Sequence, residues 1–110
     1  MTHDVMRTKA ALDSFTKARA RQVVNHGFSS GNDDAYAEGQ LADAAACYAV
    51  AHGATEIPES WPWSADWWKP SATNEPQDRK RDIEKAGALL LAEWERLDRI
   101  QQRRAEGDVT

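Results

Sequence analysis

The chain lacks most of the features that mark common enzymes and secreted proteins. Its 110 residues contain one cysteine, Cys47, which cannot form an intramolecular disulfide and which we expect to be a buried thiol. It has no glycine-rich phosphate loop, no Cys/His spacing for zinc and no nucleophile elbow, which excludes the familiar catalytic motifs. No apolar run approaches the ~20 residues of a membrane span, and the N-terminus lacks the apolar core of a secretion signal. These absences predict a soluble cytoplasmic protein with no membrane partner.

Positive charge is missing from the middle of the chain. Residues 22–68 contain no Lys or Arg, so the net charge of −4 hides an acidic block between more basic ends. Such a block can hold Mg²⁺ through carboxylates, face a basic partner, or be a solvated surface. The negative charge argues against direct nucleic-acid binding, and we interpret Arg79, Lys80 and Arg81 as a solvated helix start.

Apolar residues recur at helical spacing in three segments, which predict helices over about 4–25, 35–52 and 78–105. With no strand pattern present, we expect one all-α domain over 1–110, a three-helix bundle-like fold. Asp33 or Asp34 is placed to cap the second helix. Because three helices make a thin core, a homodimer that shares the last helix or the Trp-rich segment is one expectation. A monomer with the Trp-rich segment folded across the bundle is the alternative.

Aromatic residues are few, but tryptophan is concentrated. Four of the five tryptophans lie in 61–68, inside a crossover, 53–77, that also holds all four prolines. A covered Trp ring buries on the order of 200 Å², so this segment must pack onto something. The rings can complete the core, form an interface, or line a ligand pocket. If they complete the core, Trp63→Ala or Trp67→Ala should cost about 3–5 kcal/mol of stability.

Several motifs resemble those of a widespread family of small phage and prophage proteins. The motifs are GQLADAA at 39–45, WPWSADWWKP at 61–70, RDIEKAGALLLAE at 81–93 and RLDR at 96–99. The resemblance covers about Arg19 to Arg99. It implies a phage-type accessory protein in the host cytoplasm that engages a host defence protein or a nucleotide, a counter-defence role. The candidate binding residues are Trp61, Trp63, Trp67, Trp68, Asp33, Asp34, Glu38, Arg19 and Lys85.

More distantly, the helix pattern is similar to that of the all-α MazG-like nucleoside triphosphate pyrophosphohydrolases, in which acidic residues on two helices bind Mg²⁺ and triphosphate. This resemblance implies metal ligands at Asp33, Asp34, Glu38 and Asp98, with Arg19 or Lys85 meeting phosphate. Glu95-x-x-Asp98 matches one family motif in spacing, whereas Glu38 and Asp43 stand five apart, on different helix faces.

We therefore expect a binding protein or inhibitor without catalytic residues or a cofactor. A Mg²⁺-dependent pyrophosphohydrolase is the alternative, and a homo-oligomeric structural protein is the second alternative.

Overall fold

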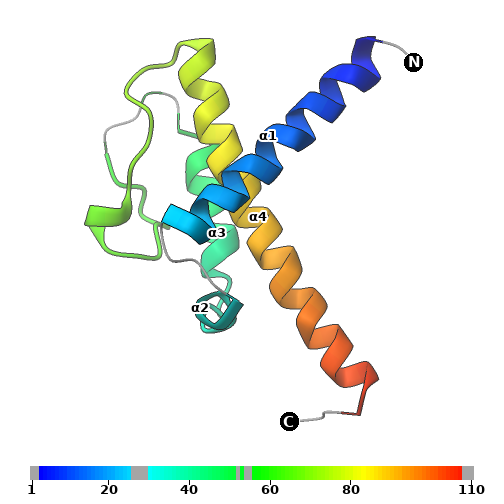
Figure 1. Cartoon of the computed structure of the whole chain (residues 1–110). Helices are drawn as coiled ribbons and strands as arrows, with labels where there is room; N and C mark the ends of the chain where they lie inside the picture. Colours follow the sequence, from blue (N-terminus) through cyan, green and yellow to red (C-terminus); the bar gives the residue numbers. More distant parts are fainter. Residues whose placement is uncertain (1–2, 26–29, 52, 54–55, 108–110) are drawn as a thin grey trace.

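Helices make up the regular secondary structure that the structure describes (Figure 1). The computed structural model describes residues 3–25, 30–51, 53 and 56–107. In chain order the elements are α1 (His3–Asn25), α2 (Ser30–Asp34), α3 (Gln40–Ala49), the short 3-10 helix η1 (Ala65–Trp67) and α4 (Pro76–Ala105). The all-α prediction is confirmed, and the last helix is the longest, as predicted. None of these helices combines the length and hydrophobicity needed to cross a membrane.

α4 begins two residues earlier than predicted, because local signals favour a start at Pro76. Proline suits the first turn of a helix, where a backbone N–H has no helical partner. Thr73 Oγ1 donates to Asp78 Oδ2 at 2.6 Å, which fixes the chain just before the helix. Asp78 in the first turn and Arg103 and Arg104 in the last turn complement the helix dipole.

The helix predicted over 35–52 is shorter and begins later. α3 begins at Gln40, because Gly39 has a φ of 86°, a left-handed conformation that a helix cannot contain. The helix ends at Ala49, and His52 lies outside the described residues.

The segment expected to be a loop before this helix contains α2. Asp33 and Asp34 lie in α2 and do not cap α3, so the capping prediction is wrong. Asp33 pairs with Arg19 of α1 and Asp34 with Arg99 of α4, both at 2.8 Å. These two ion pairs attach α2 to both long helices.

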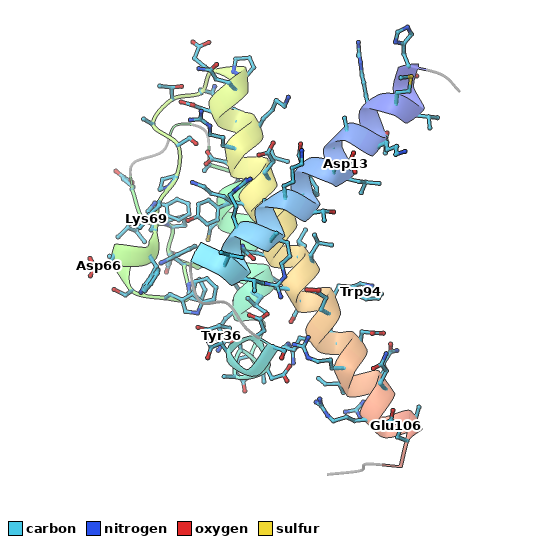
Figure 2. All side chains as sticks on the ribbon, in the orientation of Figure 1. Asp13, Tyr36, Asp66, Lys69, Trp94 and Glu106 are labelled. Carbon is cyan, nitrogen blue, oxygen red and sulfur yellow. The ribbon has the colours of Figure 1, made fainter. Side chains whose placement is uncertain are left out.

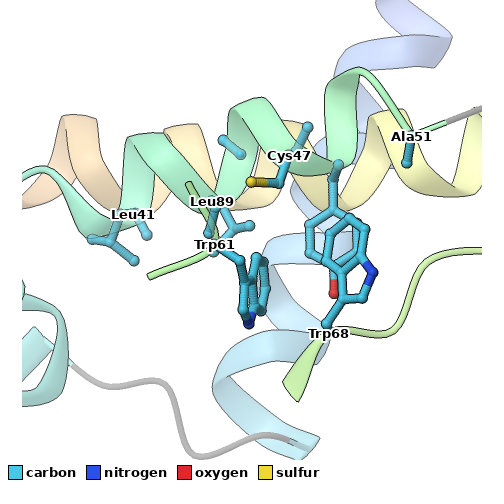
Figure 3. Close-up of a cluster of buried hydrophobic side chains, with 11 residues drawn as sticks. Leu41, Cys47, Ala51, Trp61, Trp68 and Leu89 are labelled. Atoms are coloured by element: carbon cyan, nitrogen blue, oxygen red, sulfur yellow. The ribbon is translucent and has the colours of Figure 1, made fainter. Parts of the chain in front are cut away.

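The hydrophobic core lies between α3, α4 and the crossover, which in the structure comprises residues 56–75 (Figure 3). Small residues on α3 and α4 let the two helices approach closely, and Trp61 and Trp68 cover the remaining gap, at 9% and 8% exposure. Cys47 is buried as predicted, with its Sγ 3.4 Å from Ser60 Oγ. The core cluster consists of Leu41, Ala44, Ala45, Cys47, Tyr48, Ala51, Trp61, Trp68, Ala86, Leu89 and Ala92.

α1 crosses α4 so closely that glycine is required at the crossing point. A Cβ atom at Gly87 would lie 2.4 Å from the Phe15 ring. Figure 1 shows the two helices as an X, with the crossover 56–75 on one side. The N-terminal half of α1 and the C-terminal half of α4 diverge on the other side.

Candidate ligand-binding pocket

A pocket of about 940 Å³ lies between α1, α4 and the crossover, with contributions from α2 and α3. α4 forms one wall, because positions i, i+3, i+4, i+7 and i+8 of a helix share a face. These wall residues are Arg81, Glu84, Lys85, Ala88 and Leu89. α1 contributes Ala18, Arg21 and Gln22 from its last two turns.

Aromatic rings line the pocket opposite the helices and contact one another. Trp63 lies 5.1 Å from Tyr36 and 5.5 Å from Trp61 between ring centroids. Trp61 in turn meets Tyr48 edge to face at 5.6 Å. Trp67 also lines the pocket and is 56% exposed. Five aromatic side chains therefore line the pocket; four of them form ring pairs at favourable spacings, and of these Tyr48 and Trp61 are largely covered.

Hydrogen bonds hold these rings in position. The Tyr48 hydroxyl accepts a hydrogen bond from Lys69 N at 3.2 Å and donates to the Trp67 carbonyl at 3.4 Å. Trp61 Nε1 donates to the Ser64 carbonyl at 3.0 Å, and the Ser64 hydroxyl caps η1. Because the Tyr48 and Trp61 rings are fixed before any ligand arrives, binding against them would cost little ordering entropy.

Positive side chains form the second chemical feature of the pocket. Arg21, Lys69, Arg81 and Lys85 line it, and Glu84 is the acidic residue among the described lining residues. The ion pairs between described residues include one long contact of Arg81, at 3.6 Å, and none of the other three cations. A local surplus of positive charge in a chain of net charge −4 favours an anionic ligand at this place.

Lys85 is the most enclosed of these cations. Its Nζ donates to the Lys69 carbonyl at 2.6 Å and lies 5.4 Å from the centre of the Tyr48 ring. Burial lowers the pKa of Lys85, the nearby Arg81 and Lys69 lower it further, and Asp82 opposes the shift. A bound anion would compensate the charge that burial disfavours.

Asp82 holds the end of the crossover against α4. The side chain is fully buried, and its Oδ1 accepts a hydrogen bond from Ser71 N at 2.9 Å. Together with the bond from Lys85 to Lys69, this contact fixes the segment that carries Lys69. Asp82 and Lys85 thus position the cationic wall.

The four predicted metal ligands lie in separate places. Asp33 and Asp34 are engaged by Arg19 and Arg99. Glu38 is exposed in the turn before α3, and the Asp98 carboxylate accepts from Gln102 at 3.2 Å. Among the residues that the structure describes, no three His, Cys, Asp or Glu side chains come close enough to hold a metal ion. The arrangement of carboxylates that the pyrophosphohydrolase alternative requires is not formed.

Some of the predicted binding residues line the pocket and others lie elsewhere. The pocket includes four of them: Trp61, Trp63, Trp67 and Lys85. Trp68 lies in the core behind the pocket. Arg19 does not line it, because its guanidinium binds Asp33 at 2.8 Å and Glu95 at 2.9 Å.

Sequence reasoning missed five of the aromatic and positively charged residues of the pocket: Arg21, Tyr36, Tyr48, Lys69 and Arg81. The i, i+4 spacing of Arg81 and Lys85 was an available signal, because both fall on the face that holds Ala88 and Leu89.

The interpretation of 79–81 as a solvated helix start needs correction at Arg79. Its guanidinium donates to the carbonyl oxygens of Ala49 and Ala51, with the bond to Ala49 at 3.0 Å. Arg79 therefore ties the start of α4 to the end of α3, while Lys80 and Arg81 are exposed.

Comparison of the chain with protein-family models, curated proteins and solved structures found no match. The resemblances to phage proteins and to MazG-like enzymes therefore stay predictions.

Proposed function

We propose that the protein is a binding module whose pocket binds a small ligand with an aromatic ring and an anionic group. A nucleotide is the ligand that we propose first. The observation that carries the proposal is the pairing of five aromatic side chains with four cations around one cavity. Of the two partners that the sequence suggests, a host protein or a nucleotide, this chemistry favours the nucleotide.

The two halves of a nucleotide match the two halves of the lining. Nucleobases stack on tryptophan and tyrosine with about 1–3 kcal/mol per base, and Trp67 offers an accessible ring. Phosphate oxygens accept charge-assisted hydrogen bonds from Arg and Lys, which Arg21, Arg81 and Lys85 can supply. The cavity of about 940 Å³ also lies within the range that small-molecule sites occupy.

The proposal is binding without turnover. A MazG-like reaction would need several carboxylates around Mg²⁺, whereas Asp33 and Asp34 are each committed to an arginine. If the resemblance to phage proteins holds, such a module would lower the free concentration of its ligand in the host cell.

A thermal-shift screen of the purified protein tests the proposal. The probes are nucleoside mono- and triphosphates and cyclic dinucleotides, each with and without Mg²⁺. Binding to the folded state raises the melting temperature by mass action, so at least one nucleotide should give a shift that does not require Mg²⁺.

Two pocket variants and two matched controls make the screen specific. Trp67→Ala and Lys85→Met should lose the shift. Trp94→Ala and Lys80→Met should keep it, because Trp94 and Lys80 are exposed residues of α4 outside the pocket lining. Absence of any shift across the panel, or equal loss in pocket and control variants, would refute the nucleotide assignment.

A further inference from the structure

Large apolar side chains are exposed on the side of the molecule away from the pocket. Trp94 is 65% exposed, and Figure 2 shows it projecting from α4 opposite Lys69 and the crossover. Leu90, Leu97 and Ile83 of α4 are also exposed, as are Val5 and Leu12 of α1. α1 crosses the α4 part of this surface at Gly87, and beyond that crossing Leu90, Trp94 and Leu97 remain about half exposed or more.

The exposed residues of α4 follow the spacing of a helix-packing seam. Ile83, Leu90, Trp94 and Leu97 are separated by seven, four and three residues, so they fall on one stripe. α3 packs on another side of α4, at Ala86, Leu89 and Ala92. The part of the stripe beyond the α1 crossing at Gly87 is thus a second apolar face on a helix that the core already uses, a pattern typical of contact with a further helix.

α1 adds a matching stripe. Val5, Leu12 and Arg19 are seven residues apart and share one face, and Arg19 reaches Glu95 in the C-terminal half of α4. Val5 and Leu12 therefore face the angle between the diverging helix halves, into which Trp94 projects (Figure 2).

The N-terminal half of α1 buries little of its surface. All residues from His3 to Asp13 are exposed, and a helical stretch of this length that buries little apolar surface is marginal in water. The Cα radius of gyration, 15.5 Å, exceeds the ~13 Å of a compact chain of this length. The protruding halves of α1 and α4 account for this excess.

We infer that a second copy of this chain covers the seam formed by Leu12, Leu90, Leu91, Trp94 and Leu97, of which Leu91 adjoins the stripe and is 36% exposed. A half-exposed side chain of this size presents on the order of 100 Å², so the five side chains of the seam present roughly 500 Å² of apolar surface. One side of a standard dimer interface buries ~800 Å², of which a little more than half is apolar. The seam therefore supplies the apolar area that one protomer contributes to a stable dimer.

The shape of the surface favours a second copy over a different protein. In each chain the N-terminal half of α1 and the C-terminal half of α4 protrude and leave a space between them. Two copies related by a twofold axis can therefore each insert a protruding helix half into the space of the other. The exposed α4 positions 90, 94 and 97 carry no charge, so this part of the stripe meets its own copy without charge repulsion. The assembly places α1 and α4 of both copies in one four-helix arrangement and leaves both pockets on its outer sides.

Sedimentation equilibrium of the full chain at high micromolar concentration tests this inference. We expect the wild-type protein to sediment at twice 12.3 kDa and Trp94→Glu at 12.3 kDa, with the helical circular dichroism retained. Trp67→Glu is the matched control, because Trp67 is a similarly exposed tryptophan on the pocket side, and it should remain a dimer. If Trp94→Glu does not fold, Leu12→Glu on α1 provides the same test from the other helix.

Two results would overturn the inference: a wild-type monomer, which would leave the seam to another protein, or dimers of both seam variants with unchanged dissociation constants. The outcome is separate from that of the nucleotide assignment. The seam variants should still give the nucleotide shift, and Trp67→Glu should lose the shift while remaining a dimer.

Discussion

The tryptophans of the crossover differ in how much of their rings is buried, and they differ accordingly in whether they belong to the core or line the pocket. The ring centroids of Trp61 and Trp68 lie 5.6 and 4.9 Å from that of Tyr48, and both tryptophans belong to the core. Trp67 is more than half exposed at the pocket, and Trp63 lies between the two groups. The motif at 61–68 therefore contributes to the core and to the pocket, two of the alternatives that the sequence left open.

Stability measurements should separate these two groups. Trp68→Ala should lower the free energy of unfolding by about 3–5 kcal/mol, because it removes a buried ring and leaves a cavity. Trp67→Ala should change it by less than about 1 kcal/mol, because that ring is already largely in water. This replaces the expectation that Trp63→Ala or Trp67→Ala would be the destabilising change. Urea denaturation at one fixed protein concentration measures both values, and equal losses would contradict the division.

The pH dependence of ligand binding should report on Lys85. A lysine whose pKa is lowered loses its proton at a lower pH than an ordinary lysine, and it then no longer attracts an anion. The groups around the amine are Asp82, Arg81, Lys69 and the ring of Tyr48, whose own pKa is raised chiefly by burial. Nucleotide affinity should therefore decline as the pH rises toward the ordinary lysine range.

The conservative variant Lys85→Arg provides the control for this profile. Arginine keeps its charge throughout that range, so the decline of affinity should be smaller in the variant. Titration calorimetry across pH measures both proteins, and identical profiles would show that Lys85 is not the titrating group.

At the scale of elements, α2 is held by ion pairs of unequal burial. Arg19 and Asp33 are 13% and 0% exposed in their side chains, and Arg99 and Asp34 are more exposed. Removing one partner of a buried pair leaves an uncompensated charge, so Arg19→Met should cost about 3–5 kcal/mol. Arg99→Met, the matched change at the exposed pair, should cost at most about 1 kcal/mol. Urea denaturation of the two variants compares them, and a larger loss from Arg99→Met would refute this ranking.

Local signals and distant ion pairs together explain which helix ends the sequence could predict. The ends of α1 and α4 follow from local signals, namely apolar periodicity, Pro76 and the last-turn arginines. The start of α3 was predicted too early, because Asp33 and Asp34 look like helix caps in the sequence, whereas they pair with Arg19 and Arg99 from distant positions and Gly39 sets the start.

The pocket was predictable only in part for a similar reason. Its tryptophans stand together in the sequence and were identified there. Its cations come from α1, the crossover and α4 and meet only after folding, so no local motif marks Arg21 or Lys69.

At the scale of the whole molecule, the pocket and the apolar seam lie on opposite sides of the crossed helices (Figures 1 and 2). The chain is flat, with principal extents of 48 × 43 × 22 Å, and the pocket and the seam lie on either side of the helix crossing. Because no lining residue of the pocket belongs to the seam, ligand binding and association should be independent. Calorimetric titration should give one ligand per chain in both the wild-type protein and Trp94→Glu; a stoichiometry of half a ligand per chain in the wild type would contradict that independence.

The most direct test of the central claim compares a nucleotide with its two halves. Calorimetry would measure binding of the nucleoside triphosphate that gives the largest thermal shift, of the corresponding nucleoside and of inorganic triphosphate. If rings and cations act together, the nucleotide should bind at least about tenfold more tightly than either half, since one charge-assisted contact is worth ~1.5–3 kcal/mol. A nucleoside that binds as tightly as its triphosphate would show that the cations do not take part, and the account of the pocket would be wrong.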